Sequence, residues 1–353
     1  MPIPGADGSL YFASGIDNTG LIRGRKQAVG IIKGMTSQIS KQDVFAGLAI
    51  SATVAFSKVS KEMKQFSQDF EQSMREVETI SKAVQGDFGG YSQSIIDLSK
   101  EVPQAAGELS AAYYQIVSAG YDGAAGLNLL DVSARAAVGG VTDVKTAADG
   151  LTSVMNAWKI SAEDSTRVAD SFFQTVKLGK TTMGELASNI SKVAPLAASF
   201  GVSFEEIAAA VATLTKSGTP TAEAMTQIRA SLIALNEKLG QGWGEAMSFQ
   251  EALGEVAKRA KEAGKDIKQF IGTDEAALAI LGLTGENLKR AAEDLKSYAD
   301  ALGVSTEAFE KMIETSINQS KVLKNNLKAI LKPLGDYLAG KSTEFAKKMN
   351  EAF

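Results

Sequence analysis

The sequence predicts an all-α protein with a long N-terminal heptad helix, a compact multi-helix middle domain and a long C-terminal amphipathic helix. Small or apolar residues recur alternately four and three positions apart from 45 to 84, the pattern of a helix that keeps one stripe against a partner. Turn and capping residues then recur at short intervals, and a second apolar row follows after 304. The domains expected from these shifts are 1–41, 42–85, 86–304 and 305–353.

The first segment, 1–41, contains at most one short strand, at residues 10–17, and then a basic amphipathic helix at 21–39. The start of the chain lacks the basic and apolar regions of a signal peptide, which predicts a non-secreted leader. Its cluster of cations, Arg23, Arg25 and Lys26, is typical of a solvated helix face, although it could also meet phosphate or acidic lipid.

The heptad helix follows in 42–85. At about 1.5 Å of rise per residue its seam would run roughly 60 Å, and glycines after Gln85 are expected to end it. Such a seam serves an internal bundle in some proteins and oligomerisation in others. We expect its C-terminal half to dock on the following domain and its N-terminal half to contact other copies. The expected packing positions are Phe45, Ala49, Ala52, Phe56, Val59, Met63, Phe66, Phe70, Ser73, Val77, Ile80 and Val84.

The middle segment, 86–304, predicts a succession of short packed helices. Several helix starts carry a hydroxyl residue with an acid three positions later, so that the hydroxyl caps a free backbone amide and the acid meets the helix dipole. These starts are Ser161, Thr182, Ser203 and Ser248. A similar start is expected at Ser305. Residues 240–244 are glycine-rich, but no strand precedes them and no Lys-Ser/Thr pair follows, so a phosphate cradle is not expected.

The last segment, 305–353, predicts a long amphipathic helix that Pro333 should kink or break. Its expected packing positions include Ile313, Ile317, Leu323, Leu327 and Leu334. Beside them run Lys321, Lys324, Lys328 and Lys332. The lysines are typical of a solvated face, and the alternative is contact with DNA or membrane phosphates.

The composition excludes much of enzyme chemistry. The chain has no cysteine and no histidine, which removes thiolate and imidazole metal sites and the Ser-His and Cys-His nucleophile systems. A hydrolase of glycoside or peptide bonds would need paired carboxylates, but Glu205 and Glu206 sit at a helix start and are explained as capping partners. No catalytic, cofactor or metal residue is therefore expected, and 41 acidic against 37 basic residues steer the chain to no charged partner.

Eight or so short motifs resemble, in the same order, the helical core region of the tape measure proteins of tailed bacteriophages. Residues 66–77 resemble the opening motif of that region, and the N-terminal residues 12–21 resemble a typical start of such proteins. Each motif is short and alanine-rich, so the common order over 66–282 carries the resemblance. The further motifs are 118–123, 129–132, 155–158, 167–170, 193–197, 228–232 and 270–276.

The resemblance implies a structural virion component that sets tail length during assembly and is released during DNA ejection. It implies self-association, partners among tail tube, tail tip and tail assembly chaperone proteins, and a place in the virion tail lumen after assembly in the host bacterial cytoplasm. Contact with DNA or membrane would be transient, at ejection. The chain stops soon after the core motifs, which suggests an N-terminal and core fragment. A bacterial helical scaffold or membrane-associated signalling protein that dimerises through its long helices is the alternative.

Overall fold

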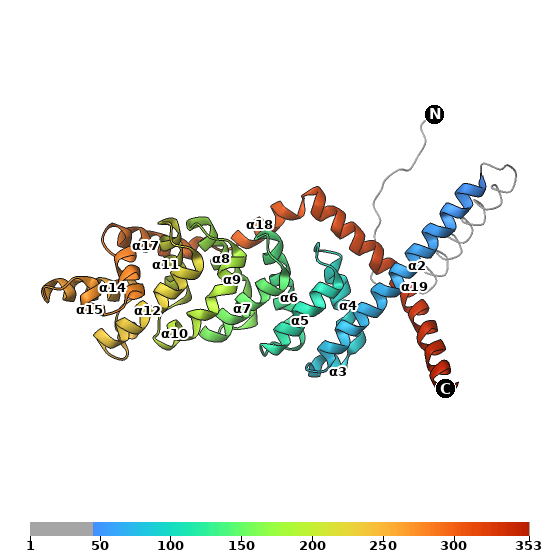
Figure 1. The fold of residues 1–353 in the computed structure, drawn as a ribbon, viewed down its shortest axis with the longest axis horizontal. Helices are drawn as coiled ribbons and strands as arrows, with labels where there is room; N and C mark the ends of the chain where they lie inside the picture. The colour runs from blue at the N-terminus through green and yellow to red at the C-terminus, as the bar shows by residue number, and fades with distance from the viewer. Residues whose placement is uncertain (1–44, 353) are drawn as a thin grey trace, which may run out of the picture. The chain divides into compact units, whose positions relative to one another are not determined.

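The computed structural model describes the backbone of residues 45–352 and the side chains of residues 58–344. Every regular element in 45–352 is a helix and none is a strand, so the all-α class is confirmed (Figure 1). The strand expected at 10–17 and the basic helix expected at 21–39 lie outside the described residues.

The chain divides into two compact units, 1–62 and 63–353. The described part of the first unit is the start of helix α2 (Phe45–Glu78), and the remaining helices belong to the second. In chain order these are α3 (Lys82–Gly86), α4 (Phe88–Ser99), α5 (Ala106–Ser118), α6 (Gly123–Gly139), α7 (Val144–Trp158), η2 (Ala162–Asp164), α8 (Ser165–Leu178), α9 (Met183–Asn189), η3 (Ile190–Lys192), α10 (Ala194–Ser199), α11 (Phe204–Lys216), α12 (Thr221–Leu239), α13 (Trp243–Ala246), α14 (Phe249–Glu262), α15 (Ile267–Ile271), α16 (Asp274–Leu283), α17 (Glu286–Ser297), η4 (Tyr298–Asp300), α18 (Val304–Ile313) and α19 (Ser316–Ala352).

Helix α2 ends at Glu78, whereas the heptad repeat predicts a helix that reaches residue 85. The hydroxyl of Ser81 accepts a hydrogen bond from the Val84 amide at 3.0 Å and so caps α3. The same hydroxyl donates to Asp122, at 2.6 Å, and the Asp122 carboxylate also accepts from the Ala83 amide. A carboxylate from the start of α6 therefore stabilises a new helix start where local periodicity predicts continuation.

The capping motifs of the middle segment form as the sequence predicts at three of their four positions. Ser203 and Glu206 make a reciprocal capping box, as do Ser248 and Glu251, and the Thr182 hydroxyl accepts from the amide of Glu185. At Ser161 the chain forms the short 3-10 helix η2 and the hydroxyl caps no backbone amide. Because these motifs close within one turn, they need no tertiary partner to form.

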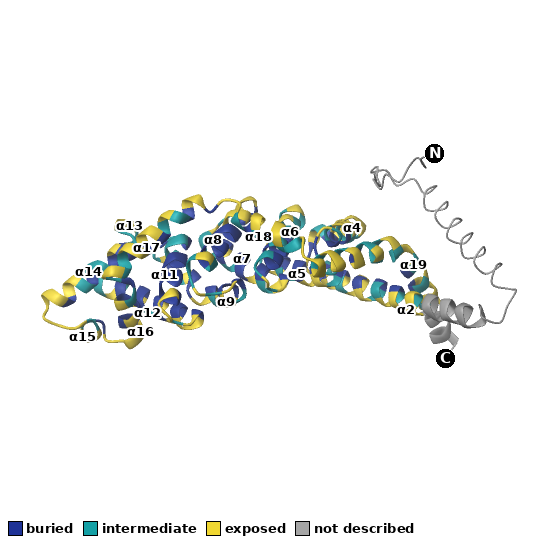
Figure 2. Ribbon diagram, turned by 90° about the horizontal axis from the view of Figure 1, so that it is seen from above, coloured by how far each residue is buried: buried dark blue, intermediate teal, exposed yellow. Residues whose placement is uncertain are grey.

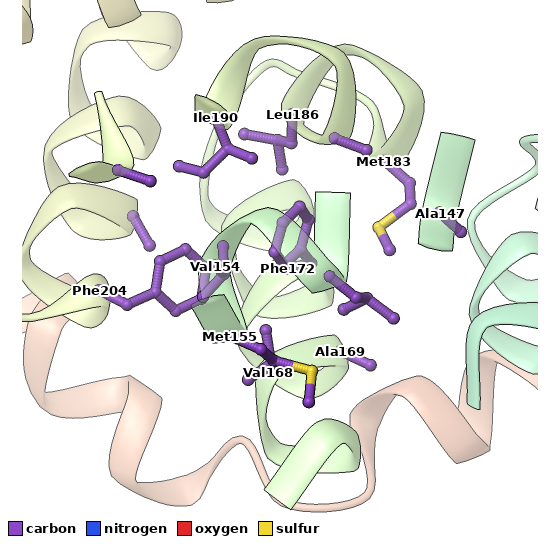
Figure 3. Close-up of a cluster of buried hydrophobic side chains, with 14 of the residues drawn as sticks. Ala147, Val154, Met155, Val168, Ala169, Phe172, Met183, Leu186, Ile190 and Phe204 are labelled. Carbon is purple, nitrogen blue, oxygen red and sulfur yellow. The ribbon is translucent and has the colours of Figure 1, made fainter. Parts of the chain in front are cut away.

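Part of the core of the second unit lies where α7, α8, α9 and α11 meet, and buried residues line the inner faces of these helices (Figure 2). Phe172 of α8 lies among Val154 of α7 and Met183 and Leu186 of α9 (Figure 3). Its ring centroid is 5.4 Å from that of Phe204 on α11. These residues belong to one continuous apolar cluster that also includes Phe70 of α2 and Phe309 of α18.

Small residues set the spacing of these helices. At Gly150 of α7 an added Cβ would lie 2.6 Å from the Cβ of Ala187 on α9, closer than two non-bonded carbon atoms can approach. The sequence is rich in alanine and glycine because the backbones of packed helices approach closely here, and the core is accordingly intolerant of added volume.

The C-terminal segment forms two helices where the sequence predicts one from residue 305. Helix α18 ends at Ile313, and the side-chain amides of Asn318 and Gln319 donate to the carbonyls of Met312 and Ile313 at 2.8 and 3.0 Å. These bonds satisfy the free carbonyls at the helix end. Helix α19 then continues through Pro333 with helical backbone on both sides, so of the kink or break expected there, the break does not occur.

Candidate functional site

The part of α2 that belongs to the larger unit buries one stripe of side chains. Its members are buried, each at most 5% exposed, and we call them the inner row: Met63, Ser67, Phe70, Met74 and Val77. Their spacing of four, three, four and three residues is a heptad repeat. The repeat was expected to pass through Phe66 and Ser73, but both are only half-buried, and the stripe runs through the next residue in each case.

Contacts with helix α19 determine which residues of α2 form this buried stripe. The hydroxyl of Ser67 donates to the carboxylate of Asp336, and Lys64 donates to the hydroxyl of Ser342 at 2.8 Å. At Gly335 an added Cβ would overlap the Met63 carbonyl oxygen, so the two backbones pass in close contact. The polar and small residues of α19 therefore face this part of α2.

Two of the four lysines of α19 also turn toward α2. The ammonium of Lys328 lies 5.2 Å from the ring centroid of Phe66, and that of Lys332 lies 5.9 Å from the centroid of Phe70. Lys332 pairs in addition with Asp336 at 2.8 Å. The expected solvated lysine face is thus divided, because Lys328 and Lys332 cover aromatic rings through cation–π contacts.

A second polar contact fixes α19 to the end of α4. The side-chain amide of Asn325, which is 7% exposed, donates to the carbonyls of Val102 and Gln104 at 3.2 and 2.8 Å. Asn326 donates to the carbonyl of Lys100 at 3.4 Å. These bonds satisfy carbonyls just beyond α4, and nothing in the local sequence around Asn325 indicates them.

The start of α18 is held in a similar way. The carboxylate of Asp170 on α8, which is 1% exposed, accepts hydrogen bonds from the amides of Gly303 and Ser305, both at 2.9 Å, and from the Ser305 hydroxyl at 2.6 Å. Ser305 was expected to cap the helix from its own position. The structure instead places Ser305 inside the first turn and supplies the cap from α8.

The structure separates the sequence-predicted packing residues into three groups. Met63, Phe70, Val77 and Val84 are buried, and Phe66, Ile313 and Leu334 are half-buried. The exposed members are Val59, Ile80, Ile317, Leu323 and Leu327. The side chains of Phe45 and Phe56 lie outside the described residues. The pattern missed Met74, which is fully buried, although its apolar side chain beside the polar Ser73 could have indicated the correct phase.

The acidic residues considered for metal binding or hydrolysis can be followed in the described part of the chain. Among residues 58–344, no group of three or more histidine, cysteine, aspartate or glutamate residues is arranged to hold a metal ion. Glu206 accepts from Ser203 and also from the Phe249 amide at 2.7 Å, and Glu205 pairs with Arg167 at 2.6 Å. The two acids considered for hydrolysis are therefore used in capping and in an ion pair.

Charged groups at helix starts are stabilised as anions. Burial alone would favour the neutral form of Asp122, but hydrogen bonds from Ser81, Ala83 and Gly123 outweigh it and lower the pKa of that carboxyl.

None of the helices in the described part of the chain combines the length and apolarity needed to cross a bilayer.

The sequence that forms the short helices of the core matches a known protein family. The model of the family described as "Phage-related minor tail protein" matches residues 92–273, which run from within α4 to just beyond α15. The chain belongs to this family. It has a structural role in the phage tail, and the resemblance noted in its motifs is confirmed.

Two curated relatives extend the match beyond the family region. The chain is 28% identical over 285 residues to the "Probable tape measure protein" of Clostridium phage phiCD119, an overlap of 74% of this chain and 30% of the relative. It is 24% identical over 288 residues to the "Tape measure protein" of Pneumococcus phage Dp-1, an overlap of 76% of this chain and 25% of the relative. The chain thus spans less than a third of either relative, and no solved structure matches it.

Proposed function

We propose that this chain acts as part of a tape measure protein, which sets tail length during phage tail assembly and is released during DNA ejection. One observation carries the proposal. The family match coincides with the compact helical core, and the two relatives that share about three quarters of this chain are both named as tape measure proteins.

The helical structure is suited to this role. A helix satisfies its backbone hydrogen bonds internally and holds a constant rise of about 1.5 Å per residue, so its length is a direct function of residue number. Helix α19 contains 37 residues and would span about 55 Å on that rise. Measuring length in this way requires no catalytic group, and we propose a non-enzymatic role.

The finer parts of the proposal concern partners and place. We expect copies of the chain to associate with one another and with tail tube, tail tip and tail assembly chaperone proteins. The expected place is the lumen of the virion tail, after assembly in the cytoplasm of the host bacterium. Contact with DNA or membrane would occur only transiently, during ejection.

A phage genome that encodes the chain provides the test. Three heptads, residues 323–343, are duplicated after Glu344, which lies beyond the hydrogen bond between Lys64 and Ser342. If α19 is part of the ruler, the 21 extra residues lengthen the tail by about 32 Å. Averaged electron micrographs of purified virions measure tail length, and mass spectrometry of the same particles measures whether the chain is present.

The matched control carries the same 21 residues in the turn at Gly264, between α14 and α15, where an added side chain would meet nothing within 4 Å. This insertion adds equal mass without extending α19, and tails should keep their ordinary length. Unchanged tails with the insertion after Glu344, or absence of the chain from purified tails, would contradict the proposed function.

A further inference from the structure

Helix α19 has an unusual distribution of side chains, because its large apolar residues face away from the rest of its unit. Leu323, Leu327, Ile330 and Tyr337 are between 52 and 67% exposed, and Leu334 is half-buried. Together we call these five residues the outer row. The residues that face α2 and α4 are polar or small, such as Asn325, Asp336 and Ala339. A helix normally buries its apolar face, but the outer row has no covering partner among residues 58–344, whose side chains the structure describes.

The spacing of the outer row indicates what kind of partner fits. Its members are separated by four, three, four and three residues, which places Leu327 and Leu334 at heptad position a and the other three at position d. A strict a/d stripe is the narrow seam of helix-to-helix packing, whereas the apolar face of a helix that lies on a bilayer is wider. The outer row therefore favours another helix over a lipid surface.

The residues beside the outer row indicate which helix. Positions e and g normally carry the charges that select a partner. Here Lys324 is the one charged residue at these positions between 324 and 340. The e positions are Lys324, Leu331 and Leu338, and the g positions are Asn326, Pro333 and Gly340. An acidic partner helix would find few cations to pair with, while a second identical seam would meet little like-charge repulsion.

The lysines at 321, 328 and 332 do not alter this balance. Lys328 and Lys332 lie over the rings of Phe66 and Phe70 within the same chain, and Lys321 lies at position b, away from the seam. Leu331 and Leu338, at e positions beside the seam, are half-buried and add no charge to it. The seam is thus apolar, nearly neutral and compatible with itself.

We propose that the outer row packs against the outer row of a second copy of this chain, so that α19 joins the copies in a helical bundle. The proposal assigns a surface to the self-association expected of the tail component proposed above, and it rests on that role for its setting. In the assembled state the inner face of α19 holds its own chain through polar contacts and the outer face holds the neighbouring copy.

Site-directed cross-linking of the full chain tests this directly, because the chain contains no cysteine. Ile330 lies at the centre of the outer row, so two seams in full overlap bring this position together in either a parallel or an antiparallel pair. We expect Ile330→Cys to form a disulfide-linked dimer under mild oxidation. The matched control, Lys321→Cys, is also exposed on α19 but lies off the seam. It should form at least about tenfold less dimer, because the cysteines of the two copies would lie too far apart to bond efficiently.

Sedimentation equilibrium of the same chain supplies the second measurement. Leu327→Asp combined with Ile330→Asp should weaken association on the order of 100-fold, since two side chains leave an apolar interface. Both side chains are exposed in the single chain, so its helical circular dichroism should remain unchanged. The control pair, Leu278→Asp with Leu281→Asp, changes exposed leucines of α16 and should leave the association constant unaltered.

Three outcomes would overturn the proposal: a monomeric mass at all concentrations, equal cross-linking of the two cysteine variants, or unaltered association of the Leu327 and Ile330 double variant. Binding of the monomer to vesicles of anionic lipid through these residues would likewise overturn it in favour of a membrane surface. The proposed tail role would stand despite any of these results if the insertion after Glu344 still lengthens the tail and purified tails still contain the chain.

Discussion

A buried carboxylate on α8 binds the start of α18, and replacing Asp170 by alanine should destabilise the protein severely. Asp170 accepts three hydrogen bonds from Gly303 and Ser305, and both Asp170 and Ser305 are buried. The alanine variant leaves two amides and one hydroxyl without an acceptor. It also removes the negative charge at the N-terminus of the helix.

The magnitude follows from these losses. A buried donor that loses its partner costs about 1–3 kcal/mol. The start of α18 can shift to expose part of its amides to water, which reduces the sum, and we expect a loss of about 3–5 kcal/mol in the free energy of unfolding. Asp170→Asn keeps the shape and one acceptor oxygen but turns an NH₂ group toward an amide, so its loss should be smaller, about 2 kcal/mol.

Urea denaturation followed by circular dichroism measures the stability, and hydrogen exchange of the amides in α18 measures the local effect. The matched control is Asp143→Ala, which removes an exposed N-cap of α7 that accepts from the Thr146 amide at 2.8 Å. An exposed cap is worth about 1 kcal/mol. The reasoning is refuted if Asp170→Ala loses no more stability than the control and the exchange of α18 stays unchanged.

Further predictions concern four single positions. Gly150→Val should destabilise by about 1–3 kcal/mol in urea denaturation because its side chain would overlap Ala187, whereas Gly107→Ala, where an added Cβ meets nothing within 4 Å, should stabilise by a few tenths to about 1 kcal/mol. Val141 is a β-branched residue with a φ of 53°, a strained backbone conformation. Val141→Gly should therefore raise the free energy of unfolding by about 0.5–1 kcal/mol, seen as a higher melting temperature. An unchanged or lower melting temperature would contradict the strain. Burial raises the pKa of Asp294, so the folded state binds its proton more tightly than the unfolded state and stability should fall as pH rises from about 4 through the raised pKa. Asp294→Asn should flatten that decline in a pH series of urea denaturations, and an equal slope in both proteins would exclude Asp294 as its source.

The local signals of the sequence predicted the helical class and most of the capped helix starts. The hydroxyl-x-x-acid motifs at Ser203 and Ser248 formed reciprocal capping boxes because both partners lie within one helical turn. The motif at Ser161 formed a 3-10 helix without the cap. The spacing signal was therefore sound for the presence of a helix start and weaker for its hydrogen bonds.

The spacing of the residues did not by itself determine the phase of the α2 seam. Phe66 and Ser73 continue the repeat as well as Ser67 and Met74, because both choices keep spacings of three and four. The structure turns Ser67 inward, where its hydroxyl meets Asp336 on α19, and leaves Phe66 under the ammonium of Lys328. A partner far along the chain selects between two phases that periodicity cannot distinguish.

The sequence by itself determined the all-helical class, the absence of thiol and imidazole chemistry and the motifs that resemble a tail protein family. Only the tertiary structure decided where the long helices end and which of their faces are covered. Asp122 starts α3 where the repeat predicts continuation, Asp170 caps α18 from α8, and Asn325 directs the polar face of α19 inward. Helix formation depends on neighbours within one turn, whereas these contacts join residues that only the folded chain brings together.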